Sequence, residues 1–164
     1  MSPYELIEPC EHEPPFTRGS AERDTAPPQR SPRAGPCRLL LIEDEWLISE
    51  LIADQLDELN LQVAGVAATV EEALHLVETV AFDAALLDMN LHQKFADGVA
   101  DAIKAKEIPF LFVSGYTKVP DPRYEDVPIL VKPFDVADLK AALQGILPPK
   151  CFRHAKAESG GALV

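Results

Sequence analysis

The 164-residue sequence lacks a long apolar run and an excess of positive charge. No stretch approaches the roughly 18 residues that span a bilayer, and the N-terminus has no basic segment followed by an apolar one. The 27 Asp and Glu residues outnumber 15 Lys and Arg residues, and the net charge of −12 repels nucleic-acid phosphates and anionic lipids. We therefore expect a cytoplasmic protein that binds neither nucleic acid nor membranes and whose partners are proteins.

Cysteine is also scarce. The three cysteines, Cys10, Cys37 and Cys151, are odd in number, lie far apart and form no C-x-x-C pair. This spacing predicts neither a zinc site nor a disulfide framework. Free thiols in a reducing cytoplasm are the expectation.

Composition divides the chain into three segments. Residues 1–36 hold 8 of the 15 prolines and few apolar residues, so we expect a disordered extension that is either inert or a docking arm for a partner. The 47% hydrophobic content is enough for one core, which we place in residues 37–148. Residues 149–164 form a second tail, too short for a further domain.

Between the tails, short apolar runs alternate with amphipathic stretches. The predicted strands span residues 38–42, 61–67, 83–87, 109–113 and 129–131, and the predicted helices span 45–59, 70–80, 97–106 and 135–147. Thr69 and Glu72 form a possible capping box at the start of the second helix. Strands and helices that alternate through short connections predict an α/β fold with a doubly wound, five-stranded parallel sheet.

Polar residues end four of the apolar runs. They are Glu43, Asp44, Asp88, Ser114 and Lys132. The carboxyl ends of parallel strands meet at one crevice, so these side chains can share a site. Carboxylate oxygens favour magnesium or calcium, and the ammonium suits a phosphoryl group. The simpler alternative is that Glu43, Asp44 and Glu45 only open the following helix, but Asp88 is not needed for that purpose.

These residues, in this order, resemble the receiver domains of two-component response regulators, which have a flavodoxin-like fold. The resemblance covers roughly residues 38–147. It implies that Glu43 and Asp44 bind Mg²⁺ and that Asp88, a further metal ligand, accepts a phosphoryl group. It also implies that the backbone carbonyl of Asn90 is a metal ligand, that Ser114 is the hydroxyl switch and that Lys132 pairs with the phosphate. The Lys132-Pro133 bond resembles the cis peptide common at this position.

By the same resemblance, the phosphoryl donor is a phosphohistidine on a sensor histidine kinase or phosphotransfer protein. The expected protein is not an enzyme but a single-domain regulator that changes its interaction with a downstream protein not identified by the sequence. Residues 109–116 resemble the Phe-Ala-Thr-Gly-containing signature of a receiver subgroup that is often single-domain, with Val113 and Ser114 in place of Ala and Thr.

Two positions depart from the common receiver pattern. Glu43 stands where an aspartate is frequent, and Ile129 stands where many receivers have a switch aromatic. The rotamer-flip mechanism is therefore not expected. Residues 117–128 contain three prolines and no helical period, so the helix between the last two strands is expected to be short or absent.

Several side chains have two interpretations. Trp46 is either a lid over the metal or, preferably, the first core residue of its helix, and Tyr116 is either an exposed partner contact or buried. His92 can shape the site entrance, but a solvated loop histidine is preferred and it is not assigned to the site.

Two other classes of function remain open. The first is an interaction module of receiver fold that works without phosphorylation. The second is a small phosphatase, because haloacid dehalogenases also use an aspartate nucleophile. The sequence Asp88-Met89-Asn90 lacks their D-x-D pattern, and no segment is long enough for a cap domain.

Overall fold

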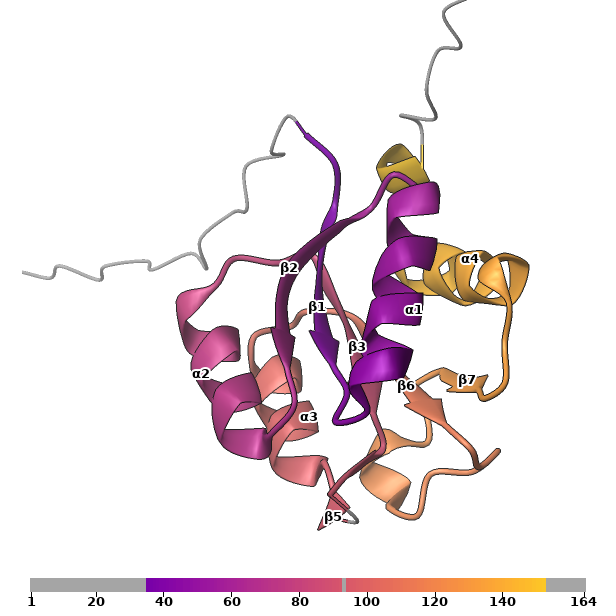
Figure 1. The fold of residues 1–164 in the computed structure, drawn as a ribbon. Helices are drawn as coiled ribbons and strands as arrows, with labels where there is room; N and C mark the ends of the chain where they lie inside the picture. The colour runs from indigo at the N-terminus through magenta and orange to yellow at the C-terminus, as the bar shows by residue number, and fades with distance from the viewer. Residues whose placement is uncertain (1–34, 93, 153–164) are drawn as a thin grey trace, which may run out of the picture. The chain divides into compact units, whose positions relative to one another are not determined.

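The structure is a computed structural model that describes residues 35–92 and 94–152. Of the extension expected to be disordered, residues 1–36, all but the last two residues lie outside the described residues. Five parallel strands form the central sheet in the order β2-β1-β3-β6-β7 (Figure 1). Their bounds are Arg38–Ile42 (β1), Gln62–Ala67 (β2), Ala84–Asp88 (β3), Phe110–Ser114 (β6) and Ile129–Val131 (β7).

Helices cover both faces of this sheet, as Figure 1 shows. Helices α1 (Trp46–Glu58) and α4 (Val136–Ile146) pack on one face, and α2 (Val70–Thr79) and α3 (Asp97–Ala105) pack on the other. Each face has its own apolar cluster, and every residue of β3 and β6 is buried. Continuous burial is the expected pattern for a parallel strand covered on both sides. The predicted five-stranded, doubly wound fold is confirmed.

Local sequence explains where two of the helices begin. Thr69 accepts a hydrogen bond from the backbone of Glu72, whose side chain accepts one from Thr69, so the predicted capping box is present at α2. Asp135 and Asp138 make the same reciprocal pair at α4. Each box satisfies backbone N–H groups that a helix start otherwise leaves without partners.

The sheet reverses its direction of growth between β1 and β3. Strand β2 lies on one side of β1, and strands β3, β6 and β7 follow one another on the other side. Helices therefore leave the two strands toward opposite faces, which opens a crevice at their carboxyl ends. Glu43 and Asp44 follow β1, and Asp88 ends β3, so the sheet order brings the acids to this crevice.

No α-helix joins β6 to β7 in the described structure. The connection contains only the short 3₁₀ helix η1 (Pro122–Tyr124), as expected from its prolines. Tyr124 is fully buried and packs edge-on against Phe95 and Phe112, and its hydroxyl donates to Asp101 of α3 at 2.6 Å. The buried side chain of Tyr124 thus holds the β6–β7 connection against α3 and the core.

A short hairpin follows β3 and was not predicted. Its strands are β4 (Asn90–Leu91) and β5 (Lys94–Phe95), paired antiparallel. Met89 and Leu91 are buried in the core, whereas Asn90 and His92 are exposed. This alternation, with a period of two, anchors the segment through one set of side chains and turns the other set outward.

The expectation of free thiols is wrong for two of the three cysteines. Cys37 and Cys151 form a disulfide with a Cα–Cα distance of 5.2 Å, and both are buried. Cys151 lies in the 3₁₀ helix η2 (Pro149–Phe152), so the beginning of the expected C-terminal tail packs against the domain. The two cysteines are 114 residues apart, and only the fold brings them together. Cys10 lies outside the described residues.

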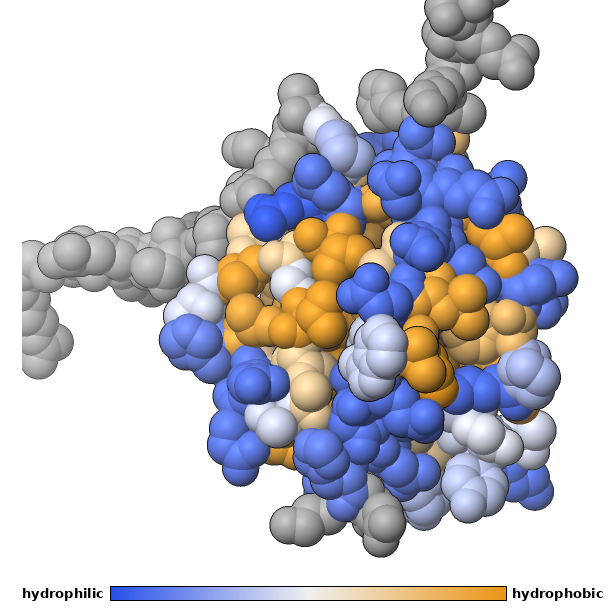
Figure 2. Space-filling model, in the orientation of Figure 1, coloured by the Kyte–Doolittle hydropathy of each residue, from blue (hydrophilic) through white to orange (hydrophobic). Residues whose placement is uncertain are grey.

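The preferred core role of Trp46 is also wrong, because Trp46 is 71% exposed. Leu47 and Leu51 of the same helix are exposed as well, and Val66 of β2 is half exposed. Figure 2 shows apolar residues on the molecular surface over α1 and β2. The buried residues of α1 are Ser49, Ile52 and Leu56, so the burial of this helix begins after Trp46. Across the described residues, we find no helix with the length and apolar character that a membrane crossing requires.

Candidate functional site

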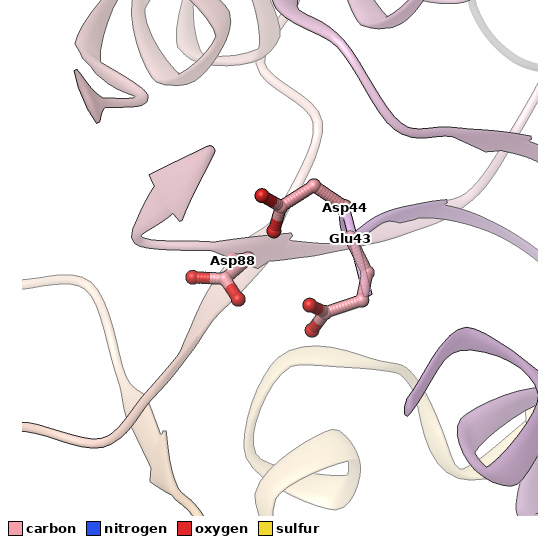
Figure 3. Close-up of side chains that lie close together, drawn as sticks. All are labelled: Glu43, Asp44 and Asp88. Carbon is pink, nitrogen blue, oxygen red and sulfur yellow. The ribbon is translucent and has the colours of Figure 1, made fainter. Parts of the chain in front are cut away.

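Three acidic side chains meet at the carboxyl end of the sheet. Glu43 and Asp44 lie in the turn between β1 and α1, and Asp88 is the last residue of β3 (Figure 3). One carboxylate oxygen from each lies within 4.8 Å of the others. Consecutive residues on a regular strand would point to opposite faces, so the turn after Ile42 is what lets both Glu43 and Asp44 approach Asp88.

Lys132 contacts two of the three acids. Its ammonium nitrogen donates to Glu43 Oε2 at 2.7 Å and to Asp88 Oδ2 at 2.8 Å. Lys132 follows β7, and the Lys132-Pro133 bond is cis, as the resemblance to receiver domains implies. Partial burial opposes the charged form of Lys132, but the hydrogen bonds to Asp88 and Glu43 outweigh it and raise its pKa.

Glu43 is buried almost completely. Burial raises the pKa of Glu43 to about 7, and the nearby charge of Asp88 acts in the same direction, while the hydrogen bond from Lys132 opposes both. Its Oε1 accepts a hydrogen bond from the backbone N–H of Glu45 at 3.2 Å. A carboxyl group held at this pKa gains its negative charge more readily when a cation binds nearby.

Asp88 has a partner at each oxygen. Lys132 binds Oδ2, and the backbone N–H of Asn90 donates to Oδ1 at 2.7 Å. The amide contact was not anticipated from the sequence, which suggested a metal-ligand role for the Asn90 carbonyl. That role stays a prediction. The two contacts fix the carboxylate in the crevice, with its side chain 11% exposed.

Ser114 ends β6, next to the strand that carries Asp88. It is buried, and its hydroxyl donates to the sulfur of Met89 at 3.7 Å and accepts from the backbone N–H of Tyr116 at 3.0 Å. Tyr116 itself is 67% exposed, which favours the partner-contact interpretation over the buried one. A pocket of about 390 Å³ is lined by Met89, Asn90, Tyr116, Thr117, Lys118 and Pro120, which include both hydrogen-bond partners of Ser114.

His92, which the sequence analysis did not assign to the site, contacts Asp44. Its backbone N–H donates to Asp44 Oδ2 at 2.9 Å, and its imidazole Nδ1 lies 3.2 Å from the same oxygen. Its side chain is 62% exposed, so it is a loop histidine as well as a site neighbour. Its closeness to Asp88 in the sequence was the available signal, but only the hairpin geometry directs it to Asp44.

The donor set fits a hard divalent cation. All three converging side chains supply carboxylate oxygen, which Mg²⁺ prefers, and no thiolate or imidazole belongs to the group that the described residues form. Crowded carboxylates repel one another, and Lys132 balances only part of that charge. The fold therefore presents an acidic pocket suited to Mg²⁺, with an ammonium group beside it.

Comparisons with known proteins agree with this geometry. A family model described as the response regulator receiver domain matches residues 39–144. The transcriptional regulatory protein PdtaR of Mycobacterium tuberculosis is 30% identical over 141 residues, which cover 83% of this chain and 68% of PdtaR.

Two solved structures of SdrG are similar over 71% of this chain and 100% of theirs, at 36% identity. The solution structure of SdrG from Sphingomonas melonis Fr1 matches with a TM-score of 0.63. The BeF3-activated conformation of SdrG from Pseudomonas melonis Fr1 matches with a TM-score of 0.62. With the sheet order, the acidic pocket and the family match in agreement, this chain belongs to the response regulator receiver domain family of two-component signalling.

Proposed function

We propose that Asp88 accepts a phosphoryl group from a phosphohistidine and that the chain works as a single-domain response regulator. The observation that carries this proposal is the position of Asp88: its Oδ2 lies 2.8 Å from the Lys132 ammonium, inside a pocket with two more acids. A carboxylate attacks a charged phosphoryl group only where cations offset the repulsion. Lys132 supplies one such cation from within the chain.

The transfer is a substitution at phosphorus. A carboxylate oxygen of Asp88 forms the new O–P bond as the P–N bond of the phosphohistidine breaks. The electron pair of that bond returns to the imidazole nitrogen, which takes up a proton. In this step Lys132 exchanges its hydrogen bond to Asp88 for one to a phosphoryl oxygen, while the Asn90 N–H keeps the carboxylate oriented. Water later hydrolyses the aspartyl phosphate.

Glu43, Asp44, Asp88 and the Asn90 backbone carbonyl would hold the metal. When bound there, Mg²⁺ offsets the negative charge that the phosphoryl oxygens bring into the pocket. The buried position of Glu43 beside the other two acids supports this assignment, because three crowded carboxylates exceed the charge of the one ammonium group near them.

Ser114 is the proposed link to the output. To hydrogen-bond a phosphoryl oxygen, its hydroxyl must leave the Met89 sulfur, and the contact with the Tyr116 amide then changes as well. The pocket lined by Tyr116, Thr117 and Lys118 belongs to the loop that would move. The exposed Tyr116 would carry this change to a protein partner. The similar protein SdrG adopts a BeF3-activated conformation, which supports activation at an equivalent site in this chain.

The proposed partners are a sensor histidine kinase or phosphotransfer protein and one downstream protein, with no nucleic acid and no membrane. The exposed side chains of Trp46, Leu47 and Leu51 stand directly after the acids and offer an apolar surface for the protein that brings the phosphohistidine. With such a donor, the proposed location of the chain is the cytoplasm.

The test is phosphorylation by acetyl phosphate with Mg²⁺, followed by intact-mass measurement under conditions that preserve acyl phosphates. We expect one added phosphate on the wild type and on Asp126→Asn, which changes an exposed aspartate after η1. We expect none on Asp88→Asn. A phosphate on Asp88→Asn would refute the acceptor assignment.

A receiver-fold module that signals by binding alone is the second candidate. The exposed apolar side chains of α1 favour it, because that surface is present without any phosphoryl group. No adduct on a wild type that binds Mg²⁺, together with a partner response unchanged in Asp88→Asn, would make this the preferred function.

A further inference from the structure

One short segment contacts two of the three acids through its backbone. The N–H of Asn90 donates to Asp88 Oδ1 at 2.7 Å, and the N–H of His92 donates to Asp44 Oδ2 at 2.9 Å. Asp88 belongs to β3 and Asp44 to the turn after β1, so the hairpin segment joins carboxylates from two different strands. Met89 and Leu91, buried on the inner side of the same segment, hold it in place.

Asp44 depends on this segment more than the other acids do. Glu43 is held by Lys132 and by the Glu45 amide, and Asp88 by Lys132 and the Asn90 amide. Within the described part of the chain, the hydrogen bond and the ion pair of the Asp44 carboxylate both come from His92, through its backbone N–H and its imidazole. Both contacts fall on Oδ2, which leaves Oδ1 as the oxygen available to a cation.

His92 makes both contacts because of its backbone conformation. Its φ is +49°, in the left-handed region that residues other than glycine seldom adopt. There the amide and the ring approach the same oxygen. His92 does not belong to the set of residues whose donor atoms can meet at one ion. Metal-ligating carboxylates are commonly held in orientation by a hydrogen-bond partner that does not itself bind the metal. The contacts of His92 with Asp44 Oδ2 have this geometry.

We propose that His92 is a positioning residue for the Mg²⁺ site: it holds Asp44 so that Oδ1 faces the cation, and hairpin β4–β5 thereby sets the metal affinity. This inference rests on the proposed function, which requires Mg²⁺ in the pocket. It assigns a role to a residue that neither binds the metal nor touches the phosphoryl group.

The test is Mg²⁺ binding measured by titration calorimetry on the full chain. Removal of an outer partner weakens metal binding by about 10–100-fold. We expect about a tenfold loss in His92→Ala and in His92→Gly, at the lower end of that range, because both variants keep the backbone N–H. His92→Asn, which tolerates positive φ and retains a side-chain donor, should recover part of the affinity. His75→Ala, an exposed histidine on α2, should bind like the wild type.

The variants separate the imidazole from the backbone. Glycine adopts positive φ without strain, whereas alanine does not. A loss in His92→Ala without a loss in His92→Gly would therefore overturn the role of the imidazole and point to backbone strain. Thermal unfolding without metal shows whether each variant folds. Equal or tighter binding in His92→Gly would also overturn the inference.

The outcome distinguishes this inference from the proposed function. Unchanged affinity in the His92 variants beside a wild type that binds Mg²⁺ refutes only the positioning role. A wild type that binds no Mg²⁺ refutes the metal site and this inference together. Phosphorylation of Asp88 is measured separately and does not enter the comparison.

Discussion

The ammonium nitrogen of Lys132 lies 2.7 Å from Oε2 of Glu43, across 89 residues of sequence. In many receivers the corresponding acid is an aspartate. Here the longer side chain of Glu43 reaches the lysine with its carboxylate, and the same lysine also binds Asp88. One ammonium group therefore connects the buried carboxylate of Glu43 to the proposed acceptor Asp88.

Replacement of Lys132 by methionine should destabilise the metal-free protein. Methionine is similar in length but leaves the carboxylates of Glu43 and Asp88 without their cation. Loss of one member of a buried ion pair costs about 3–5 kcal/mol, and partial exposure of Lys132 suggests about 3 kcal/mol here. Urea unfolding measures the change. Lys140→Met, at an exposed position of α4, is the control, and an equal effect of both variants would contradict the prediction.

The stability of the metal-free protein should fall as the pH rises from about 4.5 to about 7. A carboxyl group whose pKa is higher in the folded chain than in the unfolded chain stabilises the fold below the unfolded value, and this contribution is lost as pH passes the folded value. Glu43 has these values at 4.5 and about 7. The difference corresponds to on the order of 3 kcal/mol.

The matched variant is Glu43→Gln, whose amide stays neutral at every pH. Urea unfolding at pH 5 should give similar stability for both proteins, and at pH 8 the glutamine variant should be the more stable one. Saturating Mg²⁺ should reduce the difference, since the cation stabilises only the ionised glutamate. Parallel pH profiles for the two proteins would refute the assignment to Glu43.

Tyr124→Phe should lower the free energy of unfolding by about 1.5–3 kcal/mol. The ring stays buried against Phe95 and Phe112, but the hydrogen bond from the hydroxyl to the Asp101 carboxylate is lost. Tyr116→Phe, at an exposed tyrosine, should have little effect. Amide hydrogen exchange in residues 115–128 gives a second readout, and protection equal to the wild type in Tyr124→Phe would contradict the role of this contact.

Reduction of the Cys37–Cys151 disulfide should destabilise the domain. A cross-link that closes a loop of this length restricts the unfolded chain by about 4–5 kcal/mol. Urea unfolding with and without a reductant measures the effect. Cys37→Ser should remove the dependence on reductant, whereas Cys10→Ser should retain it. If the urea midpoint of the wild type is the same with and without reductant, the two cysteines are not bonded in solution.

The sequence was most informative where the physics is local. Apolar runs that end in Glu43, Asp88 and Ser114 predict both the strands and the meeting point of their last residues, and the structure brings the expected acids and Lys132 together. The capping box at Thr69 also follows from a short pattern. The metal and phosphoryl roles of these residues remain predictions, because proximity alone does not test them.

The features that were missed depend on distant contacts or on helical phase. Hairpin β4–β5 has strands of two residues, too short for a periodic signal, so the contact of His92 with Asp44 was not predictable. The disulfide joins residues whose closeness exists only in the folded chain. Trp46 begins its helix, and a shift of one or two positions in phase decides whether such a residue is buried or exposed.

The disulfide and the acidic pocket lie at opposite ends of β1. Cys37 directly precedes the strand, and Glu43 directly follows it, with five residues, about 17 Å of extended chain, between them. Substitutions this far apart usually act additively on stability. Oxidation of the cysteines is thus expected to stabilise the fold from one end of β1 and to leave the arrangement of the acids at the other end unchanged.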